Sequence, residues 1–166
     1  MDEERNEEPE NMEVPPSFFP YDSEDQIPGP HEGFGEPVAV RIEGVYVSQT
    51  GPDVQRFVLL TDGDRRLPIV IGEAETYAIA VPLDKKKHLR PLTHDLLASI
   101  LAKLDVQVNR VVVDDLWGST YYAKIFLDAD GQELEIDSRP SDAIALAIRC
   151  DAPVYVAEGI LDQAAQ

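Results

Sequence analysis

Residues 133–151 read Glu-Leu-Glu-Ile-Asp-Ser-Arg-Pro-Ser-Asp-Ala-Ile-Ala-Leu-Ala-Ile-Arg-Cys-Asp, and this stretch decides the fold. Its first part alternates polar and apolar residues as a half-buried strand does, and its second part is apolar and rich in alanine, as a buried helix is. Pro140 fixes its own φ and keeps Arg139 extended. We therefore predict a strand followed by a helix over about residues 140–149, with the polar side chains of residues 138–142 at the junction.

The same kinds of pattern recur upstream. We predict strands over residues 38–48, 56–61, 65–71, 108–116, 120–127, 132–136 and 153–156, a short helix over 73–81 and a longer helix over 93–104. The order is three strands and a helix, twice over, with the longer helix between the two copies. The triplet Ala78-Ile79-Ala80 matches Ala143-Ile144-Ala145 at an offset of 65 residues (143 − 78). We therefore predict an α+β domain of duplicated β-β-β-α units, whose largely antiparallel sheet has helices packed on one side.

The helix predicted over residues 93–104 begins after a basic segment. Thr93 has the side chain of a typical N-cap residue. An apolar stripe follows at spacings of three and four residues, formed by Leu96, Leu97, Ile100, Leu101 and Leu104. The pattern predicts an amphipathic helix.

Composition divides the chain into a tail and one folded domain. Residues 1–37 hold twelve acids, one arginine and seven prolines, for a net charge of −11, and the remaining residues carry −7, which gives the total of −18. The first part lacks periodic apolar positions, so it cannot bury enough surface to offset the entropy of ordering. We predict a disordered acidic tail over 1–37, a domain over 38–161 and a short C-terminal tail over 162–166.

Several functional classes are excluded by what the sequence lacks. It has no apolar run of membrane-spanning length and no basic, apolar leader, so we expect a soluble cytoplasmic protein. It contains no Gly-rich phosphate loop, no CxxC pair, no HExxH and no nucleophile elbow. The overall acidity argues against binding nucleic acid by bulk electrostatics, because such domains usually carry a basic face. One basic cluster, Lys85-Lys86-Lys87 with Arg90, is the exception.

Two similar corners carry the chemistry, Arg90-Pro91-Leu92-Thr93-His94-Asp95 and Arg139-Pro140-Ser141-Asp142. Each places an arginine before a helix and an aspartate in or near its first turn. A helix N-terminus with an adjacent arginine is suited to holding a phosphate. Histidine is the side chain that most often transfers protons near neutral pH, so His94 suits proton transfer in phosphodiester cleavage.

These corners give a set of candidate site residues. We predict catalytic roles for His94, Asp95, Asp142 and Arg139, substrate binding by Arg90, Thr93, Ser141 and Lys86, and a divalent metal, Mg²⁺ or Mn²⁺, on Asp95, Asp137 and Asp142. A purely structural interpretation stays open, because caps and first-turn acids are common and Arg139 could simply pair with one of the aspartates. A non-catalytic module that binds an anion or a partner, and a structural oligomer joined through helix 140–149, are the other hypotheses.

The two motifs also carry a resemblance. Residues 90–97 and 136–149, together with Leu-Pro-Ile-Val-Ile-Gly-Glu-Ala-Glu at 67–75, resemble the bifunctional nuclease (DNase/RNase) family, formerly a domain of unknown function. The similarity runs over about residues 38–161. It implies a small α+β domain that forms a homo-oligomer and cleaves DNA or RNA, and it points to the motif residues named above and to Glu73. The acidic tail and Lys85-Lys86-Lys87 depart from the family pattern.

Overall fold

The computed structural model describes residues 34–50, 53–86 and 88–165. The chain divides into two units, residues 1–31 and 32–166, and all the described residues belong to the second. Most of the predicted acidic tail, residues 1–33, therefore lies outside the described residues.

Seven strands and four helices make up the described part of the chain. Their order is β1 (Pro37–Thr50), β2 (Asp53–Thr61), β3 (Arg66–Ile71), α1 (Glu73–Leu83), α2 (Thr93–Lys103), β4 (Val106–Trp117), β5 (Thr120–Ala129), β6 (Gln132–Ser138), α3 (Pro140–Cys150), β7 (Val154–Ala157) and α4 (Glu158–Ala164). All the predicted strands and helices are present, and α4 is a helix that the sequence patterns did not predict.

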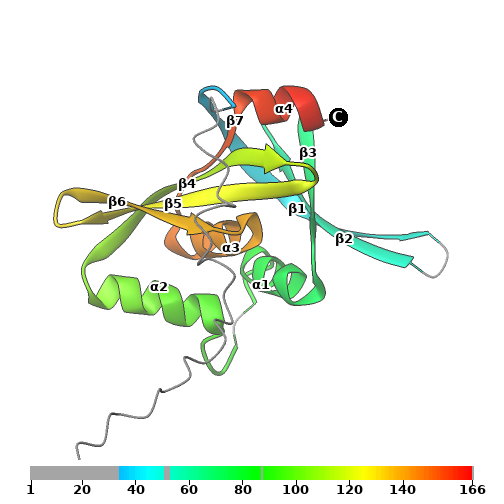
Figure 1. Ribbon diagram of the computed structural model, residues 1–166. Coiled ribbons are helices and arrows are strands. Elements are labelled where there is room, and N and C mark those ends of the chain that lie inside the picture. Colours follow the sequence, from blue (N-terminus) through cyan, green and yellow to red (C-terminus); the bar gives the residue numbers. More distant parts are fainter. Residues whose placement is uncertain (1–33, 51–52, 87, 166) are drawn as a thin grey trace, which may run out of the picture. The chain divides into compact units, whose positions relative to one another are not determined.

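The strands form one sheet in the order β3-β2-β1-β7-β4-β5-β6 (Figure 1). Neighbouring strands are antiparallel except β7 and β4, which are parallel. Each predicted triplet of strands stays together as an antiparallel meander, and β7 joins the two triplets in the middle. The predicted α+β class, the duplicated β-β-β-α units and the largely antiparallel sheet are confirmed.

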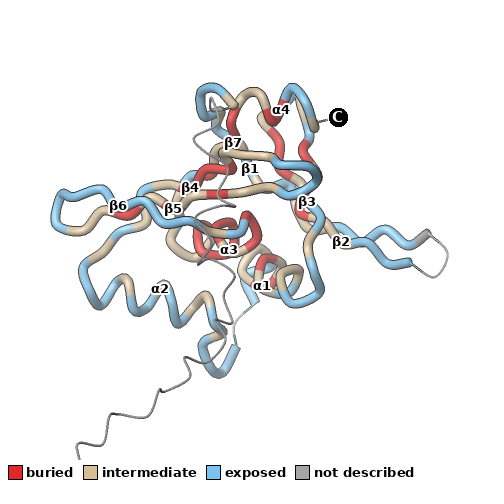
Figure 2. The backbone as a smooth tube through the Cα atoms, viewed as in Figure 1, coloured by how far each residue is buried: buried red, intermediate tan, exposed pale blue. Residues whose placement is uncertain are grey.

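Helix α3 lies at the centre of the hydrophobic core. Seven of its eleven residues are buried, and Figure 2 shows it as the most deeply buried helix. Pro140 occupies its first turn, and Asp151 ends it in the left-handed conformation, with φ of 52°. This burial corrects the hypothesis that helix 140–149 packs against a neighbouring molecule, because the helix is already covered by its own domain.

Two helix boundaries differ from the predictions. Helix α1 continues to Leu83 through Pro82, although the predicted helix ended at residue 81. The N-cap of α2 is Leu92 and not Thr93, because the carboxylate of Asp95 accepts the Leu92 N–H at 2.8 Å and closes the first turn.

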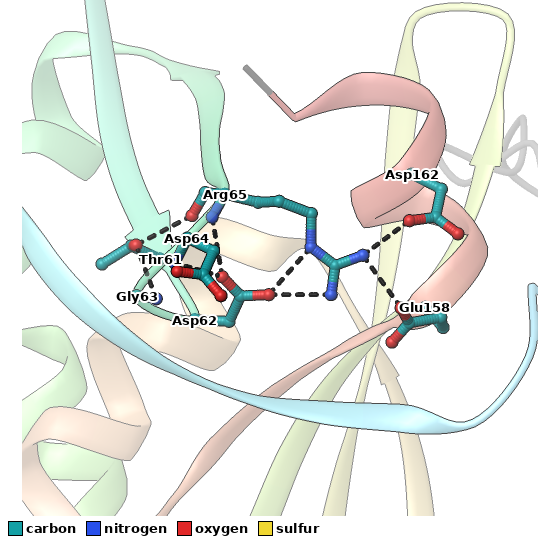
Figure 3. Close-up of polar contacts among 7 residues, drawn as sticks. All are labelled: Thr61, Asp62, Gly63, Asp64, Arg65, Glu158 and Asp162. Atoms are coloured by element: carbon teal, nitrogen blue, oxygen red, sulfur yellow. Dashed lines mark hydrogen bonds and ion pairs between the residues drawn. The ribbon is translucent and has the colours of Figure 1, made fainter.

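Helix α4 is attached to the β2–β3 turn by Arg65 (Figure 3). The guanidinium donates from Nη1 to Glu158 at 2.9 Å and to Asp162 at 2.6 Å, and from Nε to Asp62 at 2.8 Å. Hydrogen bonds from the Arg65 backbone and side chain lower the pKa of Asp62 to about 2. The turn and the last helix are therefore joined by one cation among three carboxylates.

In the described part of the chain, no helix combines the length and the apolar character that crossing a membrane requires.

Candidate functional site

A pocket of about 650 Å³ lies beside the N-termini of α1 and α3. Its walls come from β3, the β4–β5 hairpin, the last turn of α4 and the first turns of α1 and α3. The lining residues are Pro68, Ile69, Val70, Ile71, Gly72, Glu75, Leu116, Gly118, Ser119, Thr120, Tyr121, Arg139, Pro140, Ser141, Gln163 and Ala164. One of the two Arg-Pro corners therefore opens directly onto this pocket.

A chain of polar side chains joins that corner to the other one. His94 Nε2 lies 3.0 Å from Asp142 Oδ1. Arg139 donates from Nε to Asp142 Oδ2 at 2.7 Å and from Nη1 to Glu75 Oε1 at 3.0 Å. We call these four residues the polar network. It brings the two motifs together in space, although His94 and Asp142 are 48 positions apart.

Local structure explains why Arg139 and Asp142 meet. Arg139 is the N-cap of α3 and is extended, with φ of −71° and ψ of 145°, because Pro140 follows it. Asp142 is then the third residue of the helix, so its carboxylate lies next to the N-cap. The positive end of the helix dipole stabilises a negative charge at this position. The predicted ion pair between Arg139 and an aspartate is therefore present, and it forms within one turn.

The network keeps Asp142 ionised. Partial burial opposes its ionisation, but hydrogen bonds from Arg139 and His94 outweigh burial, so the pKa of Asp142 lies below its ordinary value. The ion pair with Asp142, assisted by Glu75, raises the pKa of Arg139. An ionised Asp142 is an acceptor only, so the tautomer of His94 that satisfies this contact carries its hydrogen on Nε2.

Asp95 belongs to a different set of contacts. Its carboxylate accepts the Leu92 N–H and a 2.5 Å hydrogen bond from Arg149 Nε. The hydrogen bond from Leu92, assisted by the one from Arg149, lowers the pKa of Asp95. Among the described residues, no hydrogen bond or ion pair joins the Asp95 side chain to the polar network, and its contacts hold the start of α2 against the end of α3.

The three aspartates predicted to bind a metal do not come together as one site. Among residues 34–50, 53–86 and 88–165, no group of three or more His, Cys, Asp or Glu side chains has metal-binding spacing. Asp95 and Asp142 each hold an arginine, and Asp137 lies exposed on β6. These residues therefore do not fit a common Mg²⁺ or Mn²⁺ ion in this arrangement.

The predicted substrate-binding residues are scattered. Ser141 is buried and lines the pocket. Thr93 and Arg90 are exposed, and Arg90 has no ion pair within the described residues. Lys86 pairs with Asp84 at 2.8 Å, and Lys87 lies outside the described residues.

Glu75 is the network residue that sequence reasoning did not single out. Glu73, the acid that the resemblance named, has a side chain that is 86% exposed, and its ion pair with Arg56 is long, at 3.8 Å. The side chain of Glu75 is 21% exposed and pairs with Arg139 at 3.0 Å. The carboxylate lies so close to Gly72 that a Cβ added there would collide with Oε2 of Glu75. The signal was the internal repeat, because the 65-residue offset makes the first turn of α1 equivalent to that of α3.

The family model described as "Bifunctional nuclease domain" matches residues 58–166. An uncharacterized protein of Mycobacterium tuberculosis (strain ATCC 25618 / H37Rv) is 40% identical over 127 residues, which are 75% of this chain and 74% of the relative. Bifunctional nuclease 2 of Oryza sativa subsp. japonica is 26% identical over 118 residues, 69% of this chain and 36% of the relative.

A second plant protein is similar over a shorter stretch. Bifunctional nuclease 1 of Arabidopsis thaliana is 30% identical over 93 residues, which are 54% of this chain and 29% of the relative. The chain therefore spans most of the mycobacterial protein but only about a third of these plant proteins.

Proposed function

This chain belongs to the bifunctional nuclease family, and from that premise we propose that it hydrolyses phosphodiester bonds of DNA, RNA or both. The observation that carries the proposal is the polar network, which joins a histidine of one motif and an ionised carboxylate of the other to an arginine that lines the pocket. Phosphodiester hydrolysis needs a group that takes a proton from water and a cation that receives the phosphate, and the network supplies both kinds.

In the proposed reaction, His94 is the base. Its Nδ1 accepts a proton from a water molecule whose oxygen attacks the phosphorus, and the bond from phosphorus to the leaving sugar oxygen breaks. The imidazolium then returns the proton to that oxygen. Asp142, 3.0 Å from Nε2, orients the ring and stabilises the imidazolium.

Arg139 is the proposed phosphate ligand. Its side chain is 66% exposed and lines the pocket, and its fork keeps donors for a phosphate oxygen while Nε and Nη1 bind Asp142 and Glu75. Ser141, in the first turn of α3, adds a hydroxyl beside the pocket. Glu75 is a positioning residue, because it acts through Arg139.

A requirement for Mg²⁺ or Mn²⁺ remains a prediction. The aspartates named for it do not meet in this arrangement, so no step of the proposed reaction passes through a metal. Adding a chelator to the cleavage assay tests the requirement directly, and titrating either ion back identifies it.

Cleavage of end-labelled DNA and RNA, single- and double-stranded, by the purified full chain tests the proposed function. We expect His94→Gln, Asp142→Asn and Arg139→Met each to lower kcat by at least about a hundredfold, the usual contribution of a positioned proton-transfer group. His88→Gln and Arg110→Met are matched controls, since His88 bonds Tyr77 at 3.2 Å and Arg110 bonds Glu133 at 2.7 Å. Cleavage that all five variants share would show a contaminating nuclease and contradict the proposal.

A non-catalytic module that binds an anion is the second candidate. The observation that favours it is that Arg139 is already paired with the carboxylates of Asp142 and Glu75, as it would be in a structural cluster. This alternative predicts that inorganic phosphate raises the melting temperature of the wild type but not of Arg139→Met, with no cleavage of any nucleic acid.

A further inference from the structure

The pocket beside Arg139 is larger than a phosphate group needs. Its volume of about 650 Å³ lies within the range of sites that bind whole small molecules, roughly 300 to 1,000 Å³. The proposed function uses only the part of the pocket at the first turn of α3, where Arg139 receives the phosphate. The other walls come from β3, the β4–β5 hairpin and the last turn of α4. These walls are open to a further part of the ligand.

Two donors of Ser141 help to fix where a phosphate lies. Ser141 lines the pocket and is only 8% exposed, yet its hydroxyl has no hydrogen-bond partner in the part of the chain that the structure describes. Among the same residues, its backbone N–H finds neither a side-chain cap nor a backbone partner. Both groups lie at the positive end of the α3 dipole, which favours an anion.

The wall formed by β3 and the β4–β5 hairpin is mainly apolar and includes an aromatic ring. Tyr121 and Leu116 are cross-strand partners, so their side chains lie on the same face of the hairpin. Both residues line the pocket, as Val70 and Ile71 of β3 do. A phosphate gains nothing from such a wall. The flat face of a nucleobase, in contrast, stacks on an aromatic ring and packs against aliphatic side chains.

Polar groups beside this wall are suited to the edge of a base. Gln163 of α4 lines the pocket and is exposed, and an amide both donates and accepts hydrogen bonds, as the edge of a base does. Strand β3 is an edge strand of the sheet, so the side away from β2 offers unpaired backbone donors and acceptors. The pocket therefore combines a cation, an apolar wall and neutral hydrogen-bonding groups, which together match the parts of a nucleotide.

We propose that the pocket is a subsite for one nucleotide of the substrate strand, an inference that rests on the proposed hydrolysis of phosphodiester bonds. The phosphate of this nucleotide lies on Arg139 and Ser141. Its base lies against Tyr121, and the amide of Gln163 hydrogen-bonds the edge of the base. Tyr121 and Gln163 are binding residues and take no part in proton transfer.

Isothermal titration calorimetry of the full chain with mononucleotides tests the subsite independently of cleavage, because a mononucleotide has no internucleotide bond to break. The ligands are adenosine 5′-monophosphate, adenosine 3′-monophosphate and ribose 5-phosphate. We expect the tighter of the two nucleotides to bind at least about tenfold more tightly than the sugar phosphate, since stacking a base on an aromatic ring contributes about this much affinity. Equal affinity of the nucleotides and the sugar phosphate would overturn the proposal.

Two neighbouring tyrosines allow a matched test of the stacking. Tyr121→Leu keeps an apolar side chain but removes the aromatic face, so it should abolish most of the tenfold advantage and leave the affinity for ribose 5-phosphate unchanged. Tyr122→Leu is the control. Tyr122 is also half-buried and follows in the same strand, but its side chain points to the opposite face of the sheet. Equal effects of the two substitutions would contradict stacking on Tyr121.

Gln163 is tested by comparing the monophosphates of adenosine, guanosine, cytidine and uridine. We expect the wild type to bind these four with different affinities, and Gln163→Met to reduce the differences. Gln132→Met, at an exposed position at the start of β6, is the control and should preserve them. A wild type with equal affinity for all four would overturn the role of Gln163.

The subsite and the proposed hydrolysis can fail separately. Cleavage of nucleic acid by a wild type that binds ribose 5-phosphate as tightly as a nucleotide would overturn the subsite and support the hydrolysis. Binding that depends on the base and on Tyr121, in a wild type that cleaves no nucleic acid, would support the subsite and overturn the hydrolysis.

Discussion

Arg149 donates a 2.8 Å hydrogen bond from Nη1 to the carbonyl oxygen of Ala78, the acceptor that Pro82 leaves without its usual helical donor. A proline has no N–H to give to the residue four positions earlier. The same guanidinium bonds Asp95 through Nε, and its side chain is only 6% exposed. Arg149 at the end of α3 therefore holds both α1 and α2 and completes the hydrogen bonding of a helix that runs through a proline.

Replacing Arg149 should destabilise the domain. We expect Arg149→Met to lower the free energy of unfolding by about 3 kcal/mol, because Asp95 and the Ala78 carbonyl lose a charged donor. Pro82→Ala restores a backbone N–H for that carbonyl, so Arg149→Met should cost less in the Pro82→Ala background. Urea denaturation measures both effects. Arg110→Met, which removes an exposed pair, is the control and should change stability by no more than about 1 kcal/mol.

Stability should fall in acid because of carboxylates whose pKa is lowered in the fold. The pKa of Asp62 falls from its ordinary value of 3.8 to about 2 in the folded chain. Below 3.8 the unfolded state binds its proton first, so the stability that this group contributes is complete above that pH and is lost as the pH falls through about 2.

Asp62→Asn tests this pH dependence. The variant should show a smaller slope of unfolding free energy against pH between about 4 and 2 than the wild type does. Asp95 and Asp142, whose pKa values are also lowered, contribute in the same direction. Asp53→Asn is the control, since this aspartate is exposed at the start of β2. Equal slopes for Asp62→Asn and Asp53→Asn would contradict the role of the Arg65 contacts.

Gly72 should matter for activity more than for folding. Its φ of −79° suits any residue, but a methyl group there would displace the Glu75 carboxylate from Arg139. We expect Gly72→Ala to lower nuclease activity as Glu75→Gln does, and the two together to be no worse than either alone. Melting temperatures should stay close to that of the wild type. Glu73→Gln is the control and should leave cleavage unchanged, because the Glu73 side chain is 86% exposed. Full activity of the Gly72→Ala variant would show that Glu75 has no role in the reaction.

The order of strands and helices could be predicted because apolar residues recur at the spacing typical of a strand or of a helix within each element. The alternation in residues 120–127 and the alanine-rich run after Pro140 depend only on local geometry. The internal repeat then indicated which elements are equivalent. The first turns of α1 and α3, which the repeat makes equivalent, meet at the pocket.

The orientation of α2 and the partners of the first-turn aspartates of α2 and α3 could not be predicted in this way. A stripe of leucines shows which face of a helix is apolar, but not whether its own domain covers that face. The first-turn aspartates look alike in sequence, yet Asp142 joins His94 and Asp95 joins Arg149. Those pairings depend on where α3 lies between α1 and α2, which is a tertiary property.

Helix α4 depends on Arg65 for its position, although it also contributes buried Ile160 and Leu161 to the core. We expect Arg65→Met to remove the ion pairs that attach α4 to the β2–β3 turn. Glu158 and Asp162 then repel each other without a cation between them. Hydrogen exchange should become faster in residues 158–164 and in the β2–β3 turn, but not in α3.

Gly159→Ala offers an independent test of the same helix. The added Cβ would lie 2.8 Å from the carbonyl oxygen of Phe34, which accepts the Gly159 N–H, so main chain must shift and not merely a flexible side chain. The expected result is faster exchange in residues 158–164 with the turn around Asp62 unaffected, because Arg65 still holds that turn. Since Gln163 and Ala164 line the pocket, both variants should also raise KM for a nucleic acid while kcat changes less. A loss of kcat with unchanged KM would mean that α4 supports the polar network itself.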